Sequence, residues 1–138
     1  MSGSVDLVCV DPTRVQEVWP AVKHLIVRAI LRTGLNHTAD VEYDTLHGDS
    51  LLWLAWDAEA RAIRAAATTV LARTDTELVC ILTACGGERM RAWLPLLAGI
   101  EAYARAEGCA ALRIYGRKGW ARVLDGYRVE HVILQKDL

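Results

Sequence analysis

The sequence predicts an α/β fold in which a mixed, mostly antiparallel sheet carries helices on both faces. Two segments, 15–30 and 90–104, repeat apolar residues at the three-and-four spacing of an amphipathic helix. Between them lie three apolar, partly β-branched runs joined by short polar segments, which is typical of antiparallel strands. Parts of these runs are apolar on both faces, as in strands that helices cover from both sides.

The first helix has clear start and stop signals. The short apolar run Leu7–Val10, which predicts a strand, ends at Asp11 and Pro12, which suit an N-cap and the first helical position. Apolar residues then repeat as far as Gly34. Because a proline inside a helix removes a hydrogen bond and clashes with the preceding turn, Pro20 predicts a kink or a break.

The middle of the chain predicts a short helix and then a three-stranded antiparallel meander. Residues 36–50 are polar and should form the helix and a loop. The apolar runs Leu51–Trp56, Ile63–Leu71 and Leu78–Ala84 should form the strands. The short polar segments between them suit hairpin turns.

The last third predicts a second long helix, a strand, a short helix and a closing strand. The helix has one apolar face, with Gly108 as its natural C-cap. Its apolar face consists of Met90, Trp93, Leu94, Leu97, Ile100 and Ala104. The expected strands are Cys109–Tyr115 and Val129–Lys136, and Trp120–Leu124 between them suits one or two helical turns. Trp120 lies on no apolar stripe, which favours a pocket or an interface.

Composition limits the class of protein. The 138 residues contain 53% hydrophobic and 24% charged residues, which is too apolar for a disordered chain and predicts a single domain spanning residues 1–138. The 16 Lys and Arg against 17 Asp and Glu give a net charge of −1, which speaks against a nucleic-acid-binding protein.

Cysteine spacing and hydropathy predict a reduced, cytoplasmic protein without a metal site. The four cysteines and four histidines show no zinc-ligand spacing, and the cysteines lie in or beside apolar runs, where free cysteine is usually a small buried hydrophobe. The N-terminus has no signal-peptide pattern. The longest apolar run, Leu51–Trp56, is far shorter than the roughly 20 residues of a spanning helix, so we expect no membrane segment.

The order of elements is similar to that of the GNAT superfamily of N-acetyltransferases over almost the whole chain. Residues 102–114 resemble the family's helix after its fourth strand, which ends in Gly and leads into the fifth strand. Residues 124–138 look like the family's Gly-Phe turn and closing strand, with Tyr127 in place of Phe. Residues 116–124 further resemble small GNAT-like proteins that phages and prophages encode.

The resemblance implies that acetyl-CoA binds between splayed fourth and fifth strands. A backbone N–H near Leu82 or Thr83 would polarise the thioester carbonyl. The pyrophosphate would lie on N–H groups at the N-terminus of the following helix, where glycines allow close approach. The residues that the resemblance assigns to the cofactor are Leu82, Thr83, Ala84, Gly86, Gly87, Glu88, Arg89 and Arg91, with Arg117 and Arg122 as further cations.

The start of the helix after the fourth strand has two alternatives. The family's usual glycine positions, counted back from Gly108, fall on Arg91 and Trp93, and a Trp would obstruct a backbone cradle. A helix that begins at Gly86–Gly87 restores the cradle but places Pro95 in its interior. A helix that begins near Arg91 accommodates Pro95 and leaves the two glycines in a loop.

The sequence also leaves alternatives for the general acid and the general base. The family's general acid is commonly a Tyr a few residues before the Gly-Phe turn, and that place falls on Arg122 or Val123 here. Tyr115 and Tyr127 are the candidate substitutes. A base that takes the proton of the amine could be Glu77, His131 or an ordered water.

Two functions follow from the resemblance. The first is transfer of an acetyl group from acetyl-CoA to an amine that the sequence does not identify. The second is a catalytically inactive GNAT-like module with a role in binding or assembly, because fold does not confer function. For this second function the resemblance of residues 116–124 implies a phage origin. The basic residues between 113 and 128 are either a solvated face or a clamp for CoA phosphates or an acidic partner. The sequence allows a homo-oligomer.

Overall fold

The computed structural model describes residues 5–87, 94–116 and 119–138 and contains a five-stranded sheet with the strand order β1-β2-β3-β4-β5. The strands are β1 (Val5–Cys9), β2 (Leu51–Asp57), β3 (Ala62–Arg73), β4 (Leu78–Gly87) and β5 (Ala111–Ile114). The first four pair antiparallel and β5 pairs parallel to β4. The predicted meander and the predicted fold class are therefore confirmed.

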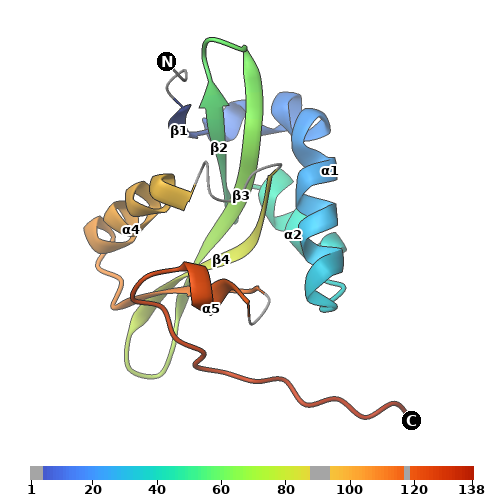
Figure 1. Ribbon diagram of the computed structural model, residues 1–138, viewed down its shortest axis with the longest axis vertical. Coiled ribbons are helices and arrows are strands. Elements are labelled where there is room, and N and C mark those ends of the chain that lie inside the picture. The colour runs from blue at the N-terminus through green and yellow to red at the C-terminus, as the bar shows by residue number, and fades with distance from the viewer. Residues whose placement is uncertain (1–4, 88–93, 117–118) are drawn as a thin grey trace.

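Helices cover both faces of the sheet (Figure 1). The turn η1 (Pro12–Arg14) and the helices α1 (Val15–Thr33) and α2 (Thr38–Leu46) precede the meander. The turn η2 (Leu94–Leu96) and α4 (Leu97–Ala106) lie on the opposite face, and the short α5 (Trp120–Val123) follows β5. No helix in these described ranges is both long and apolar enough to cross a membrane.

Strand alternation divides the core into two layers. Leu52 and Leu54 of β2 pack with α1 and α2, whereas Trp53 and Ala55 between them pack with α4. The side-chain period of two in a strand produces this division. The middle parts of the central strands β2, β3 and β4 are buried from both sides, as the apolar runs predict.

The first helix runs through Pro20 without a break. Asp11 caps η1 as predicted, accepting a hydrogen bond from the backbone N–H of Thr13 at 2.9 Å. Pro20 cannot donate to the carbonyl of Gln16, but both residues are exposed, so water can satisfy that carbonyl. Of the expected kink or break, the break is therefore wrong, because the lost bond lies on the solvent side. Gly34 ends the helix at φ +74°.

Beyond the meander, the structure excludes one of the two helix starts. Gly86 and Gly87 belong to β4 and pair with Ala66 and Ala65 of β3, so the helix does not begin there. The other start, near Arg91, falls outside the described residues, and the first described helical element after β4 is η2, which contains Pro95. Residues 88–93, which include Met90 and Trp93 of the expected apolar face, lie outside the described residues.

The predicted closing strand is wrong. Residues 127–138 adopt neither helix nor strand, and from 128 onward every residue is exposed. The apolar, β-branched pattern of Val129–Lys136 suits a strand, but no neighbouring strand within this chain pairs with it in the described residues. Figure 1 shows this segment leaving the body of the protein.

The cysteines are also only partly as predicted. Cys80 and Cys85 are buried, but Cys9 lies exposed on β1 and Cys109 is half-buried. Because β1 forms an edge of the sheet, an apolar run there does not bury every side chain.

Close packing explains the two glycines at the end of β4. A Cβ on Gly86 would overlap the backbone carbonyl oxygen of Leu25 in α1. A Cβ on Gly87 would lie 2.7 Å from the Cβ of Ala65 and 2.8 Å from the carbonyl oxygen of Arg64. Both glycines therefore have a role in packing, whatever ligand the strand binds.

Gly86→Ala should destabilise the protein because the obstructing atom belongs to helix backbone and cannot rotate away. We expect the free energy of unfolding to fall by about 1–3 kcal/mol, as for an overpacked core. Gly119→Ala is the matched control, since a Cβ there meets no atom within 4 Å. Urea unfolding should show a change of at most about 0.5 kcal/mol for the control. Equal stability of the two variants would contradict the close approach of α1 and β4.

Candidate active site

An extra residue in β4 interrupts the sheet at Thr83. Thr68 of β3 pairs with Ala84, and Thr69 pairs with Leu82, so that Thr83 has no partner in the register. Such a bulge reverses the alternation beyond it. Accordingly, Leu82 and Cys85 pack in the same core layer, whereas Ala84 packs in the other.

The pairing of β4 with β5 ends at the same place. The backbone N–H of Tyr115 donates to the carbonyl of Leu82 at 3.0 Å, and the paired residues extend from Val79 to Leu82 on β4. From Thr83 to Gly87, β4 continues in contact with β3. The predicted separation of the fourth and fifth strands therefore begins at the bulge.

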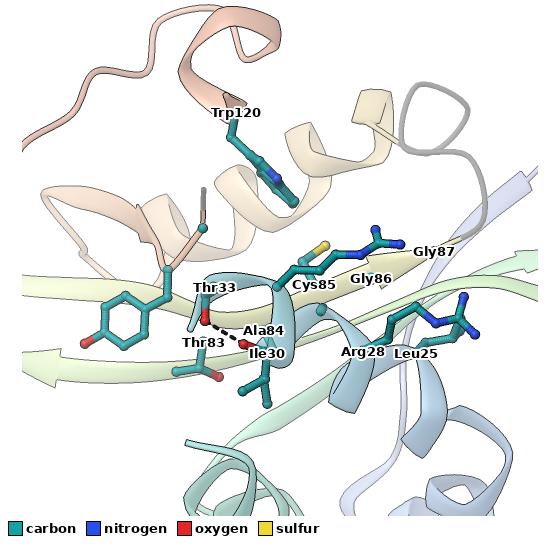
Figure 2. A pocket seen from close by; sticks show the side chains of 14 residues that line it. Leu25, Arg28, Ile30, Thr33, Thr83, Ala84, Cys85, Gly86, Gly87 and Trp120 are labelled. Carbon is teal, nitrogen blue, oxygen red and sulfur yellow. Dashed lines mark hydrogen bonds between the residues drawn. The ribbon is translucent and has the colours of Figure 1, made fainter. Parts of the chain in front are cut away.

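A cleft opens beside this free stretch of β4 (Figure 2). We call it the β4–β5 cleft. Its walls come from α1, from the end of β4 and from the chain after β5. The lining residues are Leu25, Arg28, Ala29, Ile30, Arg32 and Thr33 of α1, Thr83–Gly87 of β4, and Tyr115, Gly116 and Trp120.

Three hydrogen bonds hold the bulge. The Thr83 hydroxyl lies 2.7 Å from the Thr68 hydroxyl and donates to the Thr68 carbonyl at 3.2 Å. The Nε2–H of His37 donates to the Thr83 carbonyl at 2.9 Å. A side chain thus satisfies a strand carbonyl that the bulge removes from the regular ladder.

His37 was missed by the sequence analysis. It precedes α2, and its Nδ1 is buried without a hydrogen-bond partner in the described part of the chain. Its ring meets the Tyr115 ring edge-on, with the centroids 6.0 Å apart. Its partner Thr83 is 46 positions away in the chain, so no local spacing distinguishes His37 from the other three histidines.

The predicted cofactor residues divide into three groups. Thr83, Ala84, Gly86 and Gly87 line the cleft, whereas the Leu82 side chain is fully buried beneath it. Glu88, Arg89, Arg91 and Arg117 lie outside the described residues. Arg122 is exposed on α5 and does not line the cleft.

Two arginines that the sequence analysis did not select provide positive charge. Arg28 and Arg32 are exposed, lie on successive turns of α1 and contribute to the cleft wall. Neither forms an ion pair with another described residue. The described lining residues include no carboxylate, so this wall favours an anionic ligand.

Of the two candidate tyrosines, only Tyr115 lines the cleft. It is 43% exposed and follows directly after β5. The Tyr127 hydroxyl instead donates to the Glu101 carboxylate of α4 at 2.6 Å. Burial and this hydrogen bond raise the pKa of Tyr127 above its ordinary value. Tyr115 is therefore the candidate whose side chain lies at the cleft.

The two candidate bases lie away from the cleft. Glu77 is exposed in the turn before β4, at the opposite end of that strand from Gly87. His131 is exposed in the segment after α5. Neither residue lines the cleft.

Two further cleft residues have distinct roles. The Trp120 indole faces the cleft from the side of the chain after β5, which confirms the expectation of a pocket residue (Figure 2). Burial raises the pKa of the Cys85 thiol well above its ordinary value, so this thiol is no ready nucleophile at neutral pH.

No group of three metal-ligating side chains occurs within the ranges that the structure describes.

Comparison with solved structures identifies the fold. The sequence matches no protein-family model and no curated protein. A GNAT family acetyltransferase from Staphylococcus aureus aligns with a TM-score of 0.63 and 14% identity over 98% of this chain and 99% of its own. An aminoglycoside N-acetyltransferase solved with CoA aligns with a TM-score of 0.64 and 17% identity over 99% and 97%.

A third similar structure carries the acyl donor. A predicted acetyltransferase from Clostridium acetobutylicum, solved with acetyl-CoA, aligns with a TM-score of 0.63 and 12% identity over 96% of both chains. The alignments cover nearly the whole length of every chain, and from β1 to α5 the described elements follow the order that the sequence analysis assigned to that superfamily. The chain has the fold of the GNAT acetyltransferases.

Proposed function

We propose that this protein is an N-acyltransferase that binds acetyl-CoA in the β4–β5 cleft and transfers the acetyl group to an amine. The observation that carries the proposal is the position of the cleft. It begins where β4 and β5 separate, beside strand backbone that β5 does not occupy. Structures of the same fold that contain CoA or acetyl-CoA support an acyl-CoA as the ligand.

Each part of acetyl-CoA can contact a part of the β4–β5 cleft with suitable chemistry. The pantetheine arm carries two amides, which can pair with the backbone of Thr83–Gly87 as an added strand would. The phosphates carry negative charge, and Arg28 and Arg32 supply positive charge on a wall whose described residues include no carboxylate. The apolar face of Trp120 can pack against the arm.

The chemistry is a direct transfer. The amine nitrogen attacks the thioester carbonyl, a C–N bond forms, and the C–S bond breaks with its electron pair on sulfur. A backbone N–H at the bulge, near Leu82 or Thr83, would stabilise the negative charge on the carbonyl oxygen. Tyr115 would give its proton to the CoA thiolate. Since Glu77 and His131 lie elsewhere, an ordered water would accept the proton of the amine.

The second candidate is an inactive module that binds a ligand without turnover. One observation favours it: the family's usual position for the acid is occupied by Arg122 and Val123, both exposed on α5. This alternative predicts either no acetyl-CoA binding or binding without release of CoA. The two experiments below separate it from the enzyme.

Titration calorimetry with acetyl-CoA tests the binding site. The protein should bind, and the double variant Arg28→Ala/Arg32→Ala should bind about fivefold more weakly, because each exposed charge pair contributes up to about 1 kcal/mol. The difference should shrink as salt is added. Arg73→Ala is the matched control, since Arg73 is exposed at the end of β3 and outside the cleft.

Absence of binding at millimolar acetyl-CoA would overturn the enzyme proposal. Equal affinity of the double variant and the wild type would show that the phosphates lie elsewhere. An equal loss with Arg73→Ala would indicate an effect of net charge rather than of the cleft.

The two tyrosines give a matched pair for the chemical step. The assay measures CoA release from acetyl-CoA with a panel of amines that includes aminoglycosides. Tyr115→Phe should lower kcat by about 10²-fold and leave the Kd for acetyl-CoA within about twofold, since it removes only the proton donor. Tyr127→Phe should leave kcat nearly unchanged and lower stability by about 1 kcal/mol through loss of the Glu101 hydrogen bond.

If Tyr127→Phe lowered kcat strongly and Tyr115→Phe left it nearly unchanged, Tyr127 would be the general acid. Acetyl-CoA binding with no CoA release for any amine in the panel would favour the inactive module.

A further inference from the structure

His37 contacts the two parts of the cleft that the proposed transfer uses. Its Nε2–H donates to the carbonyl of Thr83 at 2.9 Å, which holds the bulge in β4. Its ring also meets the Tyr115 ring edge-on, with the centroids 6.0 Å apart and an angle of 78° between the planes. One side chain therefore links the strand backbone that would bind the thioester to the candidate proton donor.

The start of α2 sets the position of His37. The backbone N–H of Val41 donates to the His37 carbonyl at 3.1 Å, and His37 is the N-cap residue of that helix. An N-cap side chain commonly accepts a hydrogen bond from the first turn. The His37 side chain makes no such bond. Its backbone is thus anchored, while its side chain is free to reach β4.

Stability alone does not explain a histidine at this position. Because a carbonyl oxygen only accepts, the proton of the neutral ring lies on Nε2, and Nδ1 remains an acceptor. Nδ1 is buried and has no hydrogen-bond partner among the described residues. A buried polar atom without a partner lowers stability, and such an atom calls for an explanation beyond folding. The contact of the His37 ring with Tyr115 offers one.

Tyr115 has a fixed backbone but a side chain with few restraints. Its backbone N–H donates to the carbonyl of Leu82 at 3.0 Å, which places its Cα next to the bulge. Its side chain is 43% exposed, so water restricts the rotation of the ring little on that side. An edge-to-face aromatic contact is favourable beyond the area that it buries. The His37 ring therefore favours one orientation of the Tyr115 ring.

We propose that His37 is a positioning residue for acetyl transfer, which holds the Tyr115 ring at a fixed position relative to the Thr83 bulge. The inference rests on the function proposed above. His37 is not among the described lining residues of the cleft, so it acts through Tyr115 rather than on the substrate. A proton donor that is already oriented toward the departing sulfur needs no rotamer search, so His37 contributes to kcat rather than to binding.

His37→Gln tests the proposal, because the amide nitrogen of Gln can take the place of Nε2 as a donor to Thr83 while the ring is lost. In the CoA-release assay kcat should fall about tenfold, since a misplaced donor transfers its proton less efficiently. The Kd for acetyl-CoA should stay within about twofold of the wild-type value. His24→Gln is the matched control and should keep the wild-type kcat, since His24 is exposed on α1 and outside the described lining.

A double variant separates positioning from a general structural role. In the Tyr115→Phe background no proton donor remains to be positioned, so adding His37→Gln should change kcat by less than about twofold. A purely structural role would lower kcat by the same factor in both backgrounds.

NMR of the free protein labelled with fluorotyrosine gives a readout that needs no turnover. Tyr115→Phe identifies the Tyr115 signal among those of the four tyrosines. This signal should narrow in His37→Gln, because a ring released from its neighbour moves faster, and should keep its width in His24→Gln. If the wild type released no CoA with any amine, the proposed function would fail, and this signal would still decide whether His37 holds Tyr115.

Three results would overturn the proposal. A wild-type kcat for His37→Gln would show that the ring positions nothing. An equal loss in both Tyr115 backgrounds would show that His37 supports the fold rather than the proton donor. An unchanged width of the Tyr115 signal in His37→Gln would show that other contacts hold the ring.

Discussion

The bulge at Thr83 is the constraint on which the rest of the site depends. One extra residue in β4 ends its pairing with β5, reverses the side-chain alternation and removes the Thr83 carbonyl from the ladder. His37 satisfies that carbonyl from the start of α2, and Thr68 holds the Thr83 hydroxyl. Without these contacts, a partly buried carbonyl would have no partner and the regular ladder would be favoured. The cleft exists because the irregular strand is stabilised from both sides.

The helices then give the cleft its chemical character. Gly86 lets α1 lie directly on β4, which brings Arg28 and Arg32 to one wall. The chain after β5 brings Tyr115 and Trp120 to the other wall (Figure 2). A cationic side, an apolar side and free strand backbone converge in one opening. This arrangement suits a long ligand that carries phosphates, amides and an apolar arm.

Most of the fold could be predicted from the sequence because periodicity and turn residues are local signals. Local signals of this kind predicted the meander, both long helices and the end of the first helix at Gly34. The closing strand at Val129–Lys136 was wrong because pattern shows only that a segment suits a strand, whereas a strand also needs a neighbour. Within the site, Thr83 and Gly86 were found through a resemblance. Arg28 and Arg32 were missed because only the packing of α1 on β4 brings them to the cleft. His37 was missed because only the fold brings it to the Thr83 carbonyl, 46 positions away.

The central claim is that the opening at the Thr83 bulge is the binding site for acetyl-CoA. Backbone amide chemical shifts, recorded by NMR during a titration with acetyl-CoA, test it most directly. The account predicts that the largest shifts belong to Thr83–Gly87 and to Tyr115, Gly116 and Trp120, with little change in the turn between β3 and β4. Saturating shifts confined to residues outside the cleft would contradict it.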